Sequence, residues 1–413
     1  MSTRKEKIPI VRFRAFSEPW FQNQLSEVAE FSKGRGYSKK DIQPQGTPII
    51  LYGRLYTKYE SVISNIDTYA NMEKNSVISE GGEVIIPASG ESAAEISRAS
   101  CVTDGGVILG GDINIVKPHE NLYSSFIAIT LSNGSQQREL SKRAQGKSVV
   151  HLHNSDLKAV KLFYPSYEEQ FAIGSLFHTL DDLLVSYKDN LANFQSLKAT
   201  MLSKMFPKAG HTVPEIRLDG FEGEWEVQTL KELARFSKGN GYTKNDLVNS
   251  GKEIILYGQL YTNYQTVISK VNTFVTTVKA NAVISKGGEV IVPASGESAE
   301  DISRASVVEK SGIILGGDLN IIYPDGKKVD SIFLALTISN GSQQKELIKR
   351  AQGKSVVHLR NNDLEKVILH YPSMEEQQAI GAYFSNLDNL INSHQEKISQ
   401  LEILKKKLLQ DMF

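Results

Sequence analysis

The sequence predicts an α+β protein made of two tandem homologous domains separated by a pair of long antiparallel coiled-coil helices, with pseudo-twofold symmetry. Three observations support this fold class. The chain repeats itself after about 206 residues. Each copy contains short segments of β-forming residues bounded by glycine and polar turns. Each copy ends in a long stretch whose apolar residues recur at spacings of four and three.

The repeat extends over nearly the whole chain. Its clearest matches are GGEVIIPASGES at 81–92 with GGEVIVPASGES at 287–298, ISRAS at 96–100 and 302–306, SNGSQQ at 132–137 and 339–344, and RAQGKSVVHL at 143–152 and 350–359. A period this long exceeds that of a solenoid repeat, so each copy is expected to fold as its own domain. The expected divisions are 1–165 and 207–372 for the domains, the latter with a short linker at its start, and 166–206 and 373–413 for the helices.

The two closing stretches predict the helix pair. The seam in the first is formed by Ile173, Phe177, Leu180, Leu184 and Leu191, and the seam in the second by Ile380, Phe384, Leu387, Ile391 and Ile398. A stripe this narrow is typical of a coiled coil, whereas a helix on the surface of a domain shows a broader one. A capping box is expected at each start, Ser166 with Glu169 and Ser373 with Glu376. About 40 residues at ~1.5 Å each make a rod of roughly 60 Å.

The order of the parts predicts an antiparallel arrangement. The first helix leaves the first domain and leads to the second, so the second helix must run back along it. An antiparallel pair has a twofold axis, and B-DNA has the same local dyad. Two like domains on such a spacer suit two inverted half-sites separated by DNA that is not read.

Composition and the missing motifs predict a binding protein. Forty-seven basic residues cancel forty-seven acidic ones, so any DNA contact must use local patches or a basic partner. Without a long apolar run or a signal-peptide pattern, and with Cys101 as the single cysteine, a cytoplasmic protein with no membrane contact is expected. We find no metal-ligand cluster, nucleophile elbow or dinucleotide fingerprint, and Ser141 stands where a phosphate loop ending at Gly146 needs glycine.

The order and spacing of several segments resemble the specificity subunit of type I restriction-modification systems. These segments are PEIRLDGFEGEWE at 214–226 and its counterpart IPIVRFRAFSEPW, the helix starts YPSYEEQFAIGSLF and YPSMEEQQAIGAYF, the joint MLSKMFPKAG, and the ending LKKKLLQDMF. The resemblance implies a non-catalytic DNA reader with two target recognition domains. Two methyltransferase (M) subunits would dock on the helices, and restriction and translocase (R) subunits would join through this core.

The resemblance also implies where the cofactors lie. None is expected in this subunit, while S-adenosylmethionine, ATP and Mg²⁺ are expected on partner subunits that methylate adenine and cleave DNA. Family members commonly carry two unlike recognition domains, whereas these two are nearly the same, so a bipartite and nearly palindromic target is expected. Two alternatives stay open: the specificity subunit of another DNA-methylation or phage-defence system, and a tandem module that binds sugars or peptides on a coiled-coil stalk.

Basic, amide and aromatic residues of the repeated loops are the predicted double-stranded DNA contacts. In the first copy they are Lys33, Arg35, Tyr37, Lys39, Arg54, Lys58, Ser89, Gln136, Gln137, Arg143, Gln145 and Lys147. In the second copy they are Lys238, Asn240, Tyr242, Lys244, Gln259, Asn263, Ser295, Gln343, Gln344, Arg350, Gln352 and Lys354. Lysine and arginine neutralise phosphates, arginine reads guanine and glutamine reads adenine. Solvated turns and exposed helix charge are the competing interpretations, and His151 and His358 are expected to be core histidines.

Overall fold

The computed structural model describes residues 9–353 and 355–413. The chain divides into two compact units, of which unit 1 is Met1–Lys188 with Glu396–Phe413 and unit 2 is Asp189–Gln395. Each unit therefore contains one globular domain together with part of each long helix. In the described part of the chain, no helix combines the length and apolar character that membrane crossing requires.

The centre of unit 1 is a five-stranded sheet in the order β2-β11-β7-β9-β5. Its strands are β2 (Ala29–Lys33), β11 (Ile113–Pro118), β7 (Glu83–Pro87), β9 (Ser100–Val102) and β5 (Val62–Ile63). Neighbours are antiparallel except β5 and β9, which are parallel. All five residues of β7 are buried, because the strand is central and covered on both faces.

Smaller sheets and short helices surround this centre. A four-stranded sheet contains β10 (Ile108–Leu109), β4 (Thr47–Ile50), β6 (Tyr69–Ala70) and β3 (Ile42–Gln43), and two-stranded sheets pair β1 (Phe21–Gln24) with β13 (Lys161–Tyr164) and β12 (Val150–His151) with β8 (Ser89–Gly90). The helices are α1 (Leu25–Val28), α2 (Arg54–Thr57), α3 (Ala93–Ile96), α4 (Ser124–Leu131), α5 (Gly134–Arg143) and α6 (Asn154–Lys158), with a 3-10 turn at Lys39–Asp41. Helix α4 packs on β7 and β9 and is almost wholly buried.

Unit 2 has the same architecture. Its central sheet contains β15 (Ala234–Lys238), β25 (Leu319–Pro324), β21 (Glu289–Pro293), β23 (Ser306–Val308) and β18 (Val267–Ile268). A second sheet contains β16 (Leu247–Val248), β19 (Phe274–Val275), β17 (Lys252–Ile255), β24 (Ser311–Leu315) and β20 (Val283–Lys286), and β14 (Glu226–Thr229) pairs with β27 (Ile368–Tyr371) and β22 (Ser295–Gly296) with β26 (Val357–His358).

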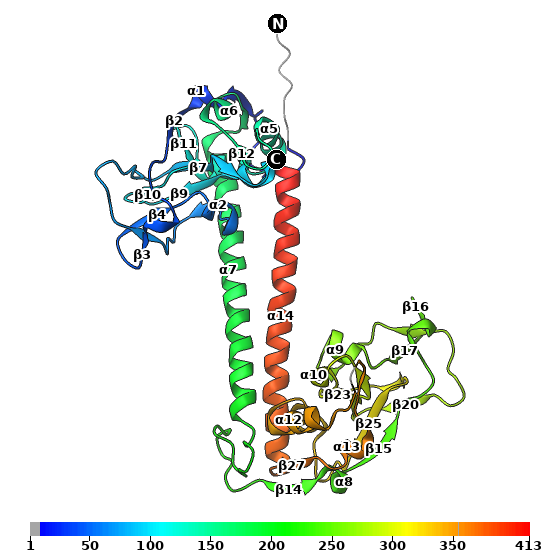
Figure 1. The fold of residues 1–413 in the computed structure, drawn as a ribbon. Coiled ribbons are helices and arrows are strands. Elements are labelled where there is room, and N and C mark those ends of the chain that lie inside the picture. Colours follow the sequence, from blue (N-terminus) through cyan, green and yellow to red (C-terminus); the bar gives the residue numbers. More distant parts are fainter. Residues whose placement is uncertain (1–8, 354) are drawn as a thin grey trace. The chain divides into compact units, whose positions relative to one another are not determined.

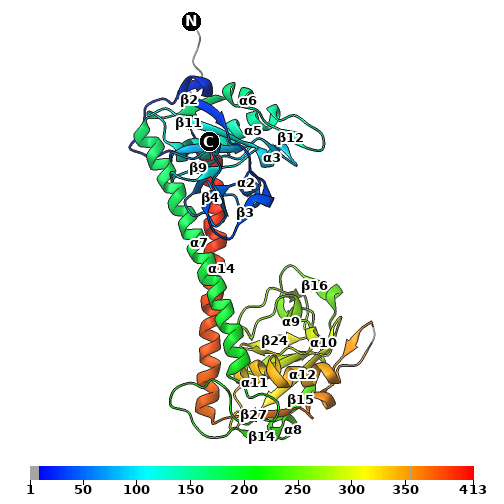
Figure 2. The ribbon, with the colours of Figure 1, turned by 60° about the vertical axis from the view of Figure 1, so that its left-hand side comes forward.

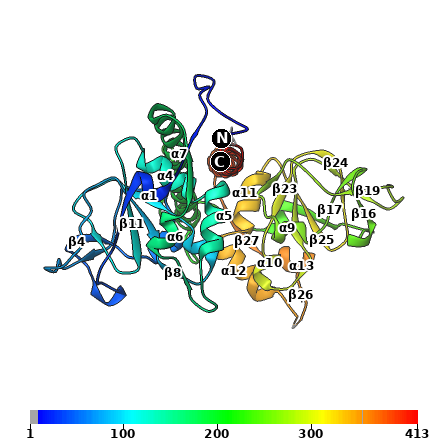
Figure 3. The same ribbon diagram turned by 90° about the horizontal axis from the view of Figure 1, so that it is seen from above.

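The helices of unit 2 follow the same plan. They are α8 (Leu230–Leu233), α9 (Gln259–Thr262), α10 (Ala299–Ile302), α11 (Ser331–Ile338), α12 (Gly341–Arg350) and α13 (Asn361–Leu364), with a 3-10 turn at Lys244–Asp246. Strands β16 and β19 lie at one end of the unit, and α11 and α12 lie at the other (Figure 3). The duplicated sequence thus produces a duplicated α+β fold, as predicted.

The long helices are α7 (Tyr167–Lys204) and α14 (Met374–Met412) (Figure 1). Inside unit 1 the Lys405 ammonium pairs with Asp181, and Lys188 pairs with Glu402 at 2.7 Å. Partner numbers fall on one helix as they rise on the other, so the helices run antiparallel there. They lie side by side in Figure 2 as well.

The predicted seam is buried or partly buried along its length, with exposed residues between its members. Inside unit 2 the same antiparallel order brings Phe194 to His394, with ring centroids 5.2 Å apart, and Lys198 to Asp388. The first two seam residues of each helix do more than line the seam. Ile173, Phe177, Ile380 and Phe384 belong to the hydrophobic cores of the two globular domains.

Only half of each predicted capping box forms. The Ser166 hydroxyl accepts from the Glu169 amide at 3.5 Å. The Glu169 carboxylate does not return to Ser166 but binds Arg12 through two bonds of 2.7 Å. In unit 2 the Glu376 carboxylate binds Arg217 in the same way, at 2.7 and 2.6 Å. Both carboxylates are almost fully buried, so the segment before each domain is joined to the start of its helix by a charged pair.

We expect Arg217→Met to lower the free energy of unfolding of unit 2 by about 3 kcal/mol, because it leaves the buried Glu376 carboxylate without its partner. Urea denaturation of the full chain measures the change. The double variant Arg217→Met with Glu376→Met should be less destabilised than the single one. Lys231→Met is the matched control, because the pair of Lys231 with Glu365 is long, at 3.9 Å, and its lysine is exposed. Equal effects of Arg217→Met and Lys231→Met would contradict the prediction.

Candidate nucleic-acid interface

Four loops meet at one end of the central sheet of unit 1. The chain leaves β2 at Lys33, and the next two amides bond across to the start of β11 and to the segment before it. The Gly34 amide donates to the Ile113 carbonyl at 2.9 Å, and the Arg35 amide donates to the Leu109 carbonyl at 3.2 Å. These bonds hold the glycine-rich loop at 33–40 against the turn formed by the sequence LGGD at 109–112.

Glycine is required where the two loops touch. A Cβ on Gly34 would overlap the Gly110 carbonyl oxygen, and the Gly111 amide donates to the Gly36 carbonyl at 2.6 Å. Tyr37 follows in the left-handed region, with φ 53°. Its hydroxyl contacts the Asn71 carbonyl at 3.0 Å, which fastens the far side of the loop. The loop backbone is therefore fixed before any ligand arrives.

The PASGES turn and the RAQGKSVVHL segment complete the cluster. The Ser89 hydroxyl donates to Asp112, which stands in the left-handed region of the LGGD turn. Ser89 also pairs with His151 across the two-stranded sheet of β8 and β12. Beyond β12, the side-chain amide of Asn154 donates to the Ser32 carbonyl at 2.8 Å. We call this cluster the loop face: residues 32–40, 89–91, 110–112 and 145–154.

The loop face exposes most of the charged and amide residues predicted for it. These are Lys33, Arg35, Lys39, Gln145 and Lys147. The prediction that His151 is a core histidine is wrong. Along β12 side chains alternate, so Val150 points inward and His151 points outward, where its ring stacks on His153 with centroids 6.3 Å apart. His358 is exposed for the same reason.

Unit 2 builds an equivalent loop face. The Gly239 backbone amide donates to the Leu319 carbonyl, the Ser295 hydroxyl donates to Asp318, and the side-chain amide of Asn361 donates to the Ser237 carbonyl. The residues exposed on it are Lys238, Asn240, Lys244 and Gln352. Lys354 lies outside the described residues. The Asn240 side chain reaches the Asn281 carbonyl at 3.4 Å, so in unit 2 this position bonds to the protein itself.

Two predicted contacts are occupied inside the protein. Only 9% of the Arg54 side chain is exposed, and its guanidinium binds Glu60 at 2.7 Å and Asp67 at 2.9 Å. Its counterpart Gln259 bonds to Thr273 at 2.7 Å. Arg54 and Gln259 therefore bond to neighbouring segments of their own domain instead of facing a ligand.

Position 58 differs from position 54. Lys58 is exposed and pairs with Asp67 at 3.2 Å, and this hydrogen bond is the main cause that lowers the pKa of Asp67 below its usual value. Its counterpart Asn263 is exposed too. Both side chains lie outside the loop face as defined above.

Helix α5 and its counterpart α12 place their glutamines outside the loop face. Gln136 and Gln343 are buried, and Gln343 donates to the Ile368 carbonyl. Gln137 and Gln344 each line a cavity beside the long helices. The prediction that these four residues contact base edges disagrees with this placement, because the first turn of α5 packs on the domain core.

The remaining predicted residues have structural partners. Arg143 and Arg350 bind the glutamates one turn earlier, at 2.9 and 2.7 Å. Ser89 and Ser295 are buried, and so is Tyr242. These residues were predicted as ligand contacts because a repeated polar residue gives the same sequence pattern whether its side chain bonds within the protein or faces solvent.

Other residues of the loop face were not among the contacts predicted from the sequence. Asn154 and Asn361 bond to the strand that precedes the glycine-rich loop, and His153 is replaced by the exposed Arg360 in unit 2. The sequence signal that could have identified these residues is their position directly after the VVHL segment, which is identical in the two copies. Among the described residues, no group of three His, Cys, Asp or Glu side chains could hold a metal ion.

Comparison with known proteins agrees with this architecture. The family model for the type I restriction modification DNA specificity domain matches residues 17–193 and 222–403. The MjaVIII specificity subunit of a type I restriction enzyme from Methanocaldococcus jannaschii is 20% identical over 407 residues, covering 95% of this chain and 91% of that protein. The crystal structure of a type I restriction-modification S subunit from M. genitalium has the same fold, with a TM-score of 0.63, 15% identity, and coverage of 98% of this chain and 99% of that one.

The chain belongs to the type I restriction modification DNA specificity family. It is a DNA-recognition specificity subunit, which is the non-catalytic part of such a system. Its partners are DNA and other subunits of a restriction-modification complex.

We expect Gly239→Ala to destabilise unit 2 by about 1–3 kcal/mol and to weaken DNA binding, because its Cβ would overlap the Gly316 carbonyl oxygen and push the loop out of place. Thermal unfolding and DNA-binding measurements on the same samples check both effects. Gly326→Ala serves as the matched control, because open space surrounds Gly326. A Gly239→Ala protein as stable as the control would refute the close approach.

Proposed function

We propose that each loop face reads one half of a bipartite DNA site. The observation that carries this is the convergence of four sequence-distant repeats at one end of each central sheet, with basic and amide side chains exposed on a backbone that the protein fixes itself. Lysines of such a face neutralise phosphates, while Arg35 and Gln145 have the donor geometry to bond to base edges.

We further propose that the two half-sites are nearly the same and inverted, so that the target is nearly palindromic. The likeness of the loop faces supports matching half-sites. The antiparallel helix pairing found inside each unit supports the inverted order, because like elements at the two ends of an antiparallel pair are related by a twofold axis.

The sequence differences between the two copies fall partly on side chains that bond within the protein and partly on exposed side chains. At one position that differs between the copies, Arg54 bonds to Glu60 and its counterpart Gln259 bonds to Thr273, so both side chains are engaged within the protein. Arg35 and Asn240 stand on the loop faces with exposed side chains. This pair is therefore the best candidate for a difference between the two half-sites, either in the base that is recognised or in the strength of the phosphate contact.

Two methyltransferase subunits are proposed to dock on the long helices, with restriction and translocase subunits joined to that core. S-adenosylmethionine, ATP and Mg²⁺ would bind to those partners. Adenine methylation and cleavage would then act at the site that this chain selects, in the cytoplasm. The family membership supports assembly with such subunits, and the number of each is part of the proposal.

Mapping methylated adenines across the genome tests the target. The expected result is a site with two similar, inverted half-sites around a non-specific spacer. Two unrelated half-sites would defeat the proposal of a near-palindrome while leaving DNA recognition intact.

Exchanging Arg35 and Asn240, as Arg35→Asn with Asn240→Arg, tests how the loop faces read DNA. If Arg35 reads a base, the exchange moves one base preference from one half-site to the other, and each wrong base costs about 1–3 kcal/mol of binding free energy. If Arg35 contacts only phosphate, the DNA affinity changes equally for all sequences. Exchanging Glu30 and Arg235, which are exposed at the opposite end of the sheets, is the control and should alter no preference.

The chain carries no net charge, so we expect the isolated subunit to bind DNA more weakly than its complex with methyltransferase subunits. Titrations of the same labelled duplex at several salt concentrations, with and without the partner, measure the difference. Equal affinity in the two states would contradict the expectation.

A further inference from the structure

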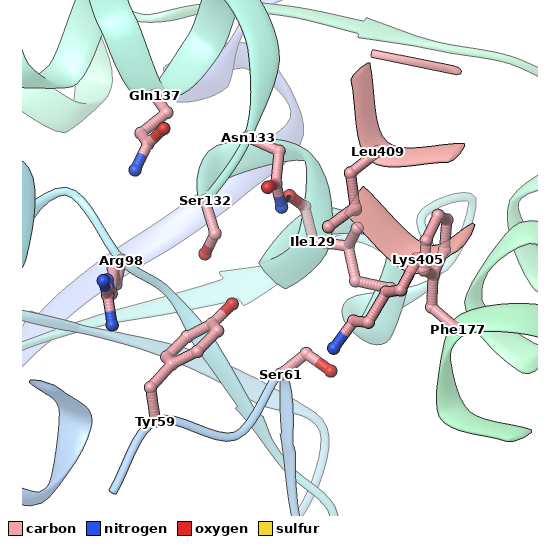
Figure 4. Close-up of a pocket in the computed structure, with 10 residues that line it drawn as sticks. All are labelled: Tyr59, Ser61, Arg98, Ile129, Ser132, Asn133, Gln137, Phe177, Lys405 and Leu409. Carbon is pink, nitrogen blue, oxygen red and sulfur yellow. Dashed lines mark hydrogen bonds between the residues drawn. The ribbon is translucent and has the colours of Figure 1, made fainter. Parts of the chain in front are cut away.

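Each unit contains a cavity that its loop face does not use. In unit 1 the cavity has a volume of about 250 Å³ and is lined by Tyr59, Ser61, Arg98, Ile129, Ser132, Asn133, Gln137, Phe177, Lys405 and Leu409 (Figure 4). In unit 2 it has about 200 Å³ and is lined by Lys198, Leu202, Tyr264, Thr266, Arg304, Leu336, Ser339, Asn340 and Gln344. Tyr59, the ISRAS repeat and the SNGSQQ repeat, three separate segments of the chain, therefore meet in one place.

The charge in the cavity of unit 1 is one unit positive. Lys405 is neutralised by Asp181, which also accepts a bond from the Ser61 hydroxyl at 3.0 Å. Arg98 is the second cation, and its guanidinium lies over the Tyr59 ring, 5.2 Å from the centroid. Burial raises the pKa of Tyr59 to about 12, so its hydroxyl remains protonated. The cavity thus presents donors and one uncompensated positive charge.

Arg98 has unused hydrogen-bonding capacity. A guanidinium carries five N–H donors. Within residues 9–353 and 355–413, neither Arg98 nor Arg304 pairs with a carboxylate or donates a hydrogen bond, although Tyr59 and Tyr264 hold them by ring contacts at 5.2 and 5.5 Å. A fixed guanidinium with open donors is suited to a bidentate anion such as phosphate.

The sheet register places this cavity at the same end as the loop face. Ile85 pairs with Ser100 in β9, so Arg98, two residues earlier, lies beside the turn that follows β7. Strand β5 runs parallel to β9, which puts Tyr59 and Ser61 at that end too. The loop face lies over β2, β11 and β7, and the cavity lies over β9 and β5, beside the long helices.

We propose that each cavity binds one phosphate of the DNA backbone flanking the half-site, with Arg98 in unit 1 and Arg304 in unit 2 as the phosphate ligands. This inference rests on the proposed reading of DNA by the loop faces. The side-chain amides of Gln137 and Gln344 assist as neutral hydrogen-bond donors to the same phosphate. The contact is independent of sequence and sets how firmly, and in what orientation, each domain holds the duplex.

A carboxylate of a docked methyltransferase subunit is the competing occupant, since the long helices form one wall of each cavity. The position at the loop-face end of the sheet favours DNA, because a duplex read by the loop face brings its own phosphates to that end. The matched polar lining of the two cavities also agrees with one phosphate contact in each half-site.

Salt-dependent DNA binding by the assembled complex of this chain with its methyltransferase tests the proposal. Arg98→Gln should weaken binding about tenfold and lower the slope of log K against log salt by about one, equally for all half-site sequences. Arg98→Gln with Arg304→Gln should lower the slope by about two. Arg98→Lys keeps the charge and should restore most of the slope. Lys117→Gln removes a cation at the opposite end of the sheet and should change neither quantity.

Thermal unfolding of each variant separates binding from folding, because Arg98→Gln leaves no buried charge behind. Unchanged affinity and slope in the double variant would overturn the phosphate site. Intact DNA contact with loss of methyltransferase from the complex would overturn it in favour of the carboxylate. Failure of the parent complex to bind DNA, or to lose binding on Gly239→Ala, would instead count against the reading function itself.

Discussion

The structure depends on the burial of aromatic residues at the ends of the long helices. In unit 1 Phe413 packs against Phe126 and Phe177, with ring centroids 5.8 and 6.1 Å apart. In unit 2 Phe206 packs against Phe333 and Phe384 at 5.9 and 6.2 Å. Each globular core is therefore completed by the end of one long helix and the start of the other. Because each domain core includes residues from both helices, the domain cannot separate from either helix without exposing that core. Each recognition domain is therefore rigidly attached to the helix pair.

Polar contacts add direction to this apolar packing. The Asp181 carboxylate joins the Ser61 hydroxyl of the domain to the Lys405 ammonium of α14. In unit 2 Asp388 joins Thr266 to Lys198. Hydrophobic contact alone allows a helix to slide or rotate, whereas a carboxylate shared between a domain and the partner helix selects one register. The orientation of each loop face relative to its helices follows from these bonds.

The loop face illustrates how a fixed backbone carries variable side chains. Gly34 and Gly110, and Gly239 and Gly316 in unit 2, make contacts that leave no room for a Cβ. Next to them stand Arg35 and Asn240, which differ although the amide bonds of Gly34 and Arg35 recur at Gly239 and Asn240. The glycine contacts hold the loop so that a single exposed position can change without disturbing the fold. The backbone and the variable exposed position are therefore independent of each other, which suits the proposed reading of two half-sites.

The sequence by itself determined the duplication, the α+β class and the helix seam. Those features depend on local periodicity and on self-similarity, which are visible in one dimension. The loop at Lys33 and Arg35 could also be predicted as exposed, because glycine and charge cluster there. The tertiary structure alone decided which repeated polar residues bond inward. Arg54 pairs with Glu60 and Asp67, Gln136 is buried in the core, and Arg98 lies over the Tyr59 ring. Their sequence contexts look alike, because a side chain's partner comes from whichever distant strand or helix the fold brings beside it.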